Sequence, residues 1–146
     1  LRDSNDLIKK IHSKFDSNSN FIMENGVISP DKFHNSMCMI SDWSGISLEY
    51  AFTFERPVIF IDVPKKIVNQ NYSDINLEPI EILIREKIGY VVSPKNLEII
   101  PEIIENIFIN NTLHEQIKKI RSETVYNIKK SAIIGADVIE KISNDL

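Results

Sequence analysis

Short apolar runs alternate with helical segments through the middle of the chain, and this alternation limits the fold more than any other feature. The clearest runs are Met37–Ile40, Val58–Ile61 and Tyr90–Val92. Met37–Ile40 and Val58–Ile61 are continuous in apolar residues, which is typical of strands buried on both faces of a parallel sheet. The sequence therefore predicts an α/β fold with a doubly wound, mostly parallel, Rossmann-like sheet flanked by helices, followed by a helical C-terminal tail.

Apolar spacing and capping residues predict the remaining elements. A fourth short strand is expected at Phe21–Met23. The expected helices are Asn5–Phe15, Pro30 to Ser36, Gly45–Phe54, Pro79–Lys87, one carrying Ile99 to Phe108, one from Asn111 or Thr112 to Lys130, and Ser131–Ile142. The polar loop from Val63 to Glu78 is long for a compact domain, so it is a candidate functional segment.

Composition indicates a single globular domain and excludes several classes of function. The 146 residues are 42% hydrophobic and 26% charged, and this length is enough to bury a core. A net charge of −4 argues against a nucleic-acid partner, which requires clustered lysine and arginine. The single cysteine, Cys38, excludes an internal disulfide and a cysteine zinc site. His12, His34 and His114 lack the spacing of metal ligands, so no metal site is expected.

Hydropathy and the start of the chain bear on location. No apolar run approaches the roughly 18 residues of a membrane span, and Leu1–Ser4 does not resemble a charged leader, so no signal peptide is expected. Because the chain starts at Leu1 rather than at a methionine, we expect a fragment of a longer protein. The lone cysteine fits a reducing cytoplasm.

A small polar turn, SDWSG, joins an expected strand to an expected helix. In parallel α/β sheets, ligands bind where strand ends lead into helices. A helix start offers unpaired N–H groups and a partial positive charge, which suit phosphate oxygens. The N–H groups of Gly45 and Ile46, with the hydroxyls of Ser44 and Ser47, would grip a diphosphate here without a lysine. The simpler alternative stays open, in which Ser44 is only an N-cap and Gly45 only a loop residue.

The stretch SDWSGISLEYAF…ERPVIFID resembles the donor-binding turn of the CDP-glycerol glycerophosphotransferase family, GT-B enzymes of the teichoic-acid polymerase type. The family pattern runs Thr/Ser-Asp-Tyr-Ser-Ser, a few apolar residues, Asp-Tyr-Ala, then Arg-Pro-Ile and an apolar strand. Asp42, Trp43 and Ser44 stand at its acid, its aromatic residue and its first serine. Arg56 and Pro57 match directly.

The chain also departs from this pattern. Gly45 replaces the second serine, which keeps the backbone N–H but loses a hydroxyl, and Glu49 replaces the later aspartate. The His-Pro element that the family carries on an earlier strand is absent, and we expect the fragment to begin just downstream of it.

The resemblance implies the C-terminal, donor-nucleotide half of a GT-B enzyme. Such an enzyme would transfer glycerol phosphate or ribitol phosphate from a CDP-linked donor to a cell-wall or capsule polymer. No cofactor or metal is implied, because the helix start at Ser44–Ser47 supplies the positive potential. The acceptor and a general base would belong to an N-terminal domain, so the fragment alone is expected to bind nucleotide weakly and to be inactive. No catalytic residue is identified within it.

Two acidic residues flank the turn. Asp42 is expected to cap N–H groups of the helix, or else to contact the donor. Glu49 either binds a ribose hydroxyl or another donor group, or lies on the surface in a salt bridge.

Three further side chains are candidates for donor contact, each with a structural alternative. Lys65, in the loop after Asp62, either lies near the donor phosphates or belongs to a solvated basic pair. Arg85 either lies near the donor phosphates, or is solvated, or pairs with Glu81 one helical turn away. Trp43 either stacks on a base or, as we expect, packs beneath the turn.

The expected helix that ends at Lys130 is basic and could contact an anionic membrane. Its basic residues are Lys118, Lys119, Arg121, Lys129 and Lys130. These side chains either form a solvated face or rest on an anionic membrane, where the family's acceptors are anchored. The second alternative predicts a cytoplasmic protein that is peripheral at the inner face of the plasma membrane.

Two other functions fit the same fold. One is a UDP- or CMP-sugar glycosyltransferase or epimerase of GT-B type. The other is a non-catalytic flavodoxin-like binding module such as a receiver domain, although the acidic pair that a receiver needs after its first strand is missing.

Overall fold

The computed structural model describes residues 2–24, 29–65, 74, 77–110 and 113–145. The chain divides into two compact units, Leu1–Asn35 (unit 1) and Ser36–Leu146 (unit 2). Most of the predicted loop from Val63 to Glu78 lies outside the described residues.

Unit 1 holds two helices. Helix α1 (Arg2–Phe15) confirms the first predicted helix, and the short helix α2 (Pro30–His34) begins at the proline, as predicted. The predicted strand at Phe21–Met23 is wrong, because this segment has no strand partner. The ring of Phe21 instead packs on Phe15 of α1, with 5.2 Å between the ring centroids.

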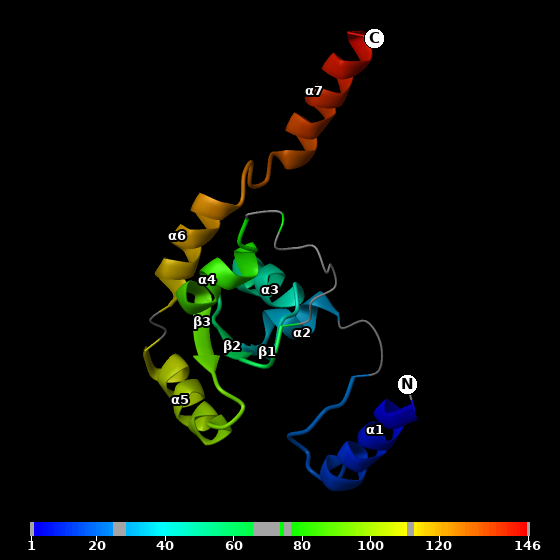
Figure 1. Cartoon of the computed structure of the whole chain (residues 1–146), viewed down its shortest axis with the longest axis vertical. Helices are drawn as coiled ribbons and strands as arrows, with labels where there is room; N and C mark the ends of the chain where they lie inside the picture. The colour runs from blue at the N-terminus through cyan, green and yellow to red at the C-terminus, as the bar shows by residue number, and fades with distance from the viewer. Residues whose placement is uncertain (1, 25–28, 66–73, 75–76, 111–112, 146) are drawn as a thin grey trace. The chain divides into compact units, whose positions relative to one another are not determined.

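Unit 2 is built on a three-stranded parallel sheet, near the centre of Figure 1. The strands are β1 (Met39–Ser41), β2 (Val58–Ile61) and β3 (Gly89–Val92), in the order β1-β2-β3. Both pairs are parallel. This arrangement confirms a mixed α/β fold with a parallel sheet. The strands lie in sequence order, which was not predicted.

The prediction that the first strand is buried on both faces is wrong. Ile40 in β1 is 50% exposed, whereas Val58, Ile59 and Phe60 in β2 are at most 1% exposed. The difference follows from position, because β2 pairs on both sides and β1 pairs only with β2 among the described strands.

Helices flank both faces of the sheet. Helices α3 (Ile46–Phe54) and α4 (Ile80–Ile88) connect the strands, and α6 (His114–Thr124) packs against both of them. After the 3-10 turn η2 (Leu97–Ile99), helix α5 (Ile100–Asn110) packs on the sheet through a core of Ile59, Val92 and Ile107. Phe60 contacts Arg85 of α4. Since neighbouring strand residues point to opposite faces, α4 and α5 cover opposite sides of β2.

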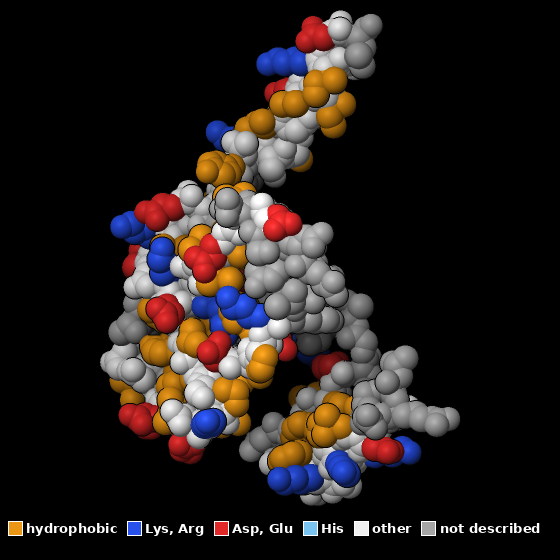
Figure 2. Space-filling model, in the orientation of Figure 1, with side chains coloured by type: hydrophobic (Ala, Val, Ile, Leu, Met, Phe, Trp, Pro, Cys, Tyr) orange, Lys and Arg blue, Asp and Glu red, His pale blue; other side chains and the backbone are white. Residues whose placement is uncertain are grey.

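The C-terminal helices differ from the prediction at one boundary. The helix expected to reach Lys130 ends at Thr124, because Val125 is extended and Asn127 and Lys129 have positive φ angles of 55° and 65°. The last helix, α7 (Ser131–Asn144), confirms the predicted one. It has no buried residue, and Figure 2 shows its hydrophobic side chains on the surface.

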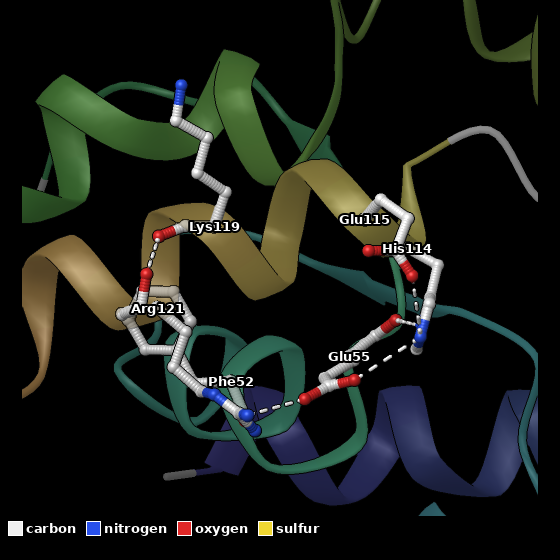
Figure 3. Close-up of polar contacts among 7 residues, drawn as sticks. Phe52, Glu55, His114, Glu115, Lys119 and Arg121 are labelled. Carbon is white, nitrogen blue, oxygen red and sulfur yellow. Dashed lines mark hydrogen bonds and ion pairs between the residues drawn. The ribbon is translucent and has the colours of Figure 1, made fainter. Parts of the chain in front are cut away.

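A polar junction attaches α6 to the end of α3 (Figure 3). Glu55 caps α3 in a left-handed conformation, and its carboxylate pairs with Arg121 at 2.5 Å and with His114 at 3.3 Å. Arg121 also donates to the carbonyl oxygen of Phe52 at 3.0 Å. The Arg121 guanidinium therefore neutralises the negative end of α3. Arg121 serves this junction, so it does not belong to a solvated basic face.

Gly89 permits the close approach of β3 to β2. It is buried at the first position of β3, and a Cβ there would overlap the carbonyl oxygen of Val58 and lie 2.8 Å from its carbonyl carbon. Its φ of −179° is ordinary extended backbone, so packing rather than conformation requires the glycine.

Replacing Gly89 by alanine should therefore force β2 and β3 apart. We expect Gly89→Ala to lower the free energy of unfolding by about 3 kcal/mol, measured by urea denaturation. The matched control is Gly135→Ala in α7, where a Cβ meets nothing within 4 Å and helix propensity favours alanine. Equal stability of the two variants would contradict the close approach.

Candidate functional site

The predicted diphosphate-binding turn lies between β1 and α3. Gly45 is the N-cap of α3, and no side chain caps this helix. The N–H of Ser47 donates to the carbonyl oxygen of Ser44 at 3.1 Å. The N–H groups of Gly45 and Ile46 donate to no acceptor among the described residues. Two backbone donors are therefore available at the helix start, where a partial positive charge also lies.

The two serines of the turn are not equivalent. Ser47 is 2% exposed, and its hydroxyl donates to the carbonyl oxygen of Ser44. Its hydroxyl thus stabilises the turn from within and is not directed to solvent. Ser44 is half-buried. Of the donors that the sequence suggested, the N–H groups of Gly45 and Ile46 and the Ser44 hydroxyl have no partner among the described residues, whereas the Ser47 hydroxyl has one.

Gly45 is not required by the fold. Its φ of −59° and ψ of −27° suit any residue, and a Cβ there would meet nothing within 4 Å. The position therefore accepts substitution, which makes it a place where binding can be tested without disturbing the fold.

The acidic residues of the turn lie on the surface. The predicted cap by Asp42 is wrong, because α3 has no side-chain cap and begins with Gly45 already in a helical conformation. Asp42 and Glu49 are both exposed, and Glu49 lies in the first turn of α3.

Trp43 connects the turn to the loop after β2 and to α4. Its indole N–H donates to the carbonyl oxygen of Val63 at 2.7 Å. The guanidinium carbon of Arg85 lies 3.8 Å from its ring centroid, and the Nζ of Lys65 lies 5.4 Å from the same centroid. Trp43 therefore has packing contacts, as expected, and both predicted cationic residues, Lys65 and Arg85, lie over its ring in the turn after β1.

Arg85 is a buried cation with a partner that the sequence did not reveal. Its side chain pairs with Asp62 at 3.0 Å, not with Glu81. The residue is 5% exposed, and its Nε and Nη2 atoms have no hydrogen-bond partner among the described residues. The pair spans 23 positions and thus leaves no local spacing signal. The one hint was that Asp62 ends a strand at the edge where α4 begins.

A second polar network fixes Ser36, which precedes β1, to Tyr50 and Arg56. The Tyr50 hydroxyl lies 2.9 Å from the hydroxyl of Ser36, and Arg56 donates to the Ser36 carbonyl oxygen. Burial raises the pKa of Tyr50 above its ordinary value. The Ser36 hydrogen bond and the Arg56 charge oppose this shift in pKa but do not cancel it. Arg56 of the ERP motif therefore has a structural role in this chain.

The histidines His12 and His34 and the single cysteine show no sign of a catalytic or metal-binding role in the described structure. His12 pairs with Asp16 at 2.8 Å, and His34 is exposed. Burial raises the pKa of the Cys38 thiol, which keeps it protonated and weakly nucleophilic. Within the part of the chain that the structure describes, no group of three or more histidine, cysteine, aspartate or glutamate side chains could hold a metal ion.

The groups gathered around Trp43 are of the kind that anion sites use. They combine two open N–H groups at a helix start with Lys65 and Arg85, and both cations lie over one indole ring. Asp42 and Glu49 are exposed residues close to this turn in the sequence, and Asp62 pairs with Arg85; their carboxylates can accept hydrogen bonds from hydroxyl groups.

Comparison with known protein families finds no matching family model, and comparisons with curated proteins and with solved structures find no similar protein. The resemblance to the glycerophosphotransferases therefore remains a prediction from the residues themselves. Among the described helices, none is both long and apolar enough to cross a membrane.

The hydrogen bond of Trp43 can be tested by removing its donor alone. We expect Trp43→Phe to lower the free energy of unfolding by about 1 kcal/mol, because the Val63 carbonyl loses its partner while a ring remains over Arg85. Circular dichroism during urea denaturation measures the effect. Tyr126→Phe is the control, since Tyr126 is 83% exposed and its change should be within about 0.5 kcal/mol. An unchanged Trp43→Phe variant would show that the contact does not secure the turn.

Proposed function

We propose that this chain is the donor-nucleotide-binding domain of a transferase that moves glycerol phosphate or ribitol phosphate from a CDP-linked donor to a cell-wall or capsule polymer. The observation that carries the proposal is the start of α3, where the N–H groups of Gly45 and Ile46 have no acceptor among the described residues. Lys65 lies over the ring of Trp43 in the same turn. The resemblance of the SDWSG turn and the ERP motif to the glycerophosphotransferases supports the choice of donor.

The helix start suits the chemistry of this transfer. An acceptor hydroxyl would attack the phosphorus that bears the polyol, the bond to the bridging oxygen would break, and CMP would leave with the negative charge. Backbone N–H groups that already point at the phosphate stabilise such charge without reorganising. The turn at Gly45 and Ile46 would therefore stabilise the leaving nucleotide, while the attacking group and its base would come from outside this chain.

The fold is compatible with this role. A parallel sheet with helices on both faces, and a ligand turn after a strand, suits the Rossmann-like C-terminal half of a GT-B enzyme. A peripheral contact with an anionic membrane would involve Lys118 and Lys119, which are exposed on α6. Arg121 would not take part, because it is bound to Glu55.

Nucleotide titration followed by NMR tests the proposal. We expect CDP to shift the amide signals of Gly45 and Ile46 at lower concentration than CMP, UDP or GDP. Preference for UDP or for CMP would instead favour a sugar-nucleotide enzyme. If no nucleotide moves these amides at millimolar concentration, the transferase proposal fails and a non-catalytic module is favoured.

A pair of variants separates the backbone donor from other effects. Gly45→Pro removes the N–H at a φ that proline adopts, whereas Gly45→Ala keeps the N–H. We expect the proline variant to bind CDP about tenfold more weakly than the alanine variant, because it loses one hydrogen bond to a charged group. Urea denaturation should show both variants folded. Equal CDP affinities would mean that the Gly45 N–H does not bind the phosphate.

A further inference from the structure

We infer that Arg85 is a second, side-chain part of the anion site, which binds one phosphate group through its Nε and Nη2 atoms while Asp62 competes for the guanidinium. This inference rests on the proposed function for the identity of the ligand, a nucleoside diphosphate. It adds a residue and a competing carboxylate to the helix start already described.

The two atoms without partners form one recognition edge. In a guanidinium, the Nε–H and the nearer N–H of Nη2 point the same way, and this edge matches two oxygens of a phosphate. The Nη1 atom, on the other side, already donates to Asp62 at 3.0 Å. Arg85 thus has one edge partly occupied and one complete bidentate edge that is buried and has no acceptor among the described residues, so an anion must displace its covering atoms to reach it.

Burial makes this open edge unusual. Arg85 is 5% exposed, yet Asp62, its one ion-pair partner among the described residues, has a side chain that is 52% exposed. Buried N–H groups without acceptors are costly, and a buried charge is stable only when it is well paired. An anion that docks against the free edge would supply both the missing acceptors and the missing charge.

The position of the guanidinium fits the phosphate turn. It stacks at 3.8 Å on the ring centroid of Trp43, two residues before the open N–H of Gly45. Lys65 lies over the same ring. A diphosphate has two charged groups, so one can lie at the helix start while the other meets Arg85.

Arg121 provides an internal comparison. Its guanidinium also has an Nε atom without a partner, but Nη1 donates to Phe52 and Nη2 pairs with Glu55. It therefore has no open bidentate edge. Anion binding should distinguish the two arginines within one protein.

The arginine Nε–H signals of the whole chain test the inference with inorganic pyrophosphate as the probe. The chain has four arginines, Arg2, Arg56, Arg85 and Arg121, so each signal can be assigned by an Arg→Lys variant. We expect pyrophosphate to shift the Arg85 signal saturably and to leave the Arg121 signal in place. An unmoved Arg85 signal at saturating pyrophosphate overturns the inference.

Two variants give effects of opposite sign. Arg85→Gln should weaken pyrophosphate binding about tenfold, the value of a charged bidentate contact. Asp62→Asn should strengthen it at least about threefold, because the competing carboxylate becomes neutral. If Arg85→Gln does not fold, Arg85→Lys keeps the charge and should still lose affinity, since lysine has no bidentate edge. Unchanged affinity in both Asp62→Asn and the folded Arg85 variant also overturns the inference.

The outcomes separate this inference from the proposed function. If CDP shifts the amide signals of Gly45 and Ile46 but pyrophosphate leaves the Arg85 Nε–H signal unchanged, the transferase proposal stands and the role of Arg85 is rejected. If pyrophosphate moves the Arg85 signal while no nucleotide moves those amides, the anion site stands and the transferase proposal falls.

Discussion

The pairing of the central strand Val58–Ile61 with a parallel strand on each side is the constraint on which unit 2 depends. Parallel pairing brings the carboxyl ends of all three strands to one edge of the sheet. The turn after β1 and the loop after β2 consequently become neighbours, and the hydrogen bond from Trp43 to Val63 is formed there. The close approach at Gly89 secures the opposite, amino end of the β2–β3 pair, whereas at the carboxyl edge the N–H of Asp62 donates to the carbonyl oxygen of Val92. The candidate site exists because the sheet collects these segments.

Two kinds of positive potential meet at this edge. One is the start of α3, which comes from backbone geometry and costs the chain no charged residue. The other is the Arg85 guanidinium, which α4 holds under Trp43 while its free edge lacks acceptors. The first is a general property of helices, but the second is specific to this chain. Under the proposal, a diphosphate would meet both with its two phosphate groups and so bind more tightly than a single phosphate.

The sequence predicted what depends on local pattern. The strand Val58–Ile61 was predicted at its observed bounds, because a continuous apolar run before a polar loop leaves few alternatives. The prediction failed at Phe21–Met23, where an apolar run without a strand partner packs on α1 instead. The end of α6 at Thr124 was missed as well, since left-handed residues such as Asn127 and Lys129 do not alter the apolar period.

Of the site, the turn and its helix start were visible in the sequence. The Arg85–Asp62 pair was not, because tertiary packing alone brings these residues together.

A crystal structure of the chain with CDP tests the central claim most directly, namely that the edge beside α3 binds a diphosphate. The account predicts phosphate oxygens within about 3 Å of the backbone nitrogens of Gly45 and Ile46. A CDP molecule whose phosphates lie away from this turn, in crystals grown at saturating nucleotide, would contradict the account.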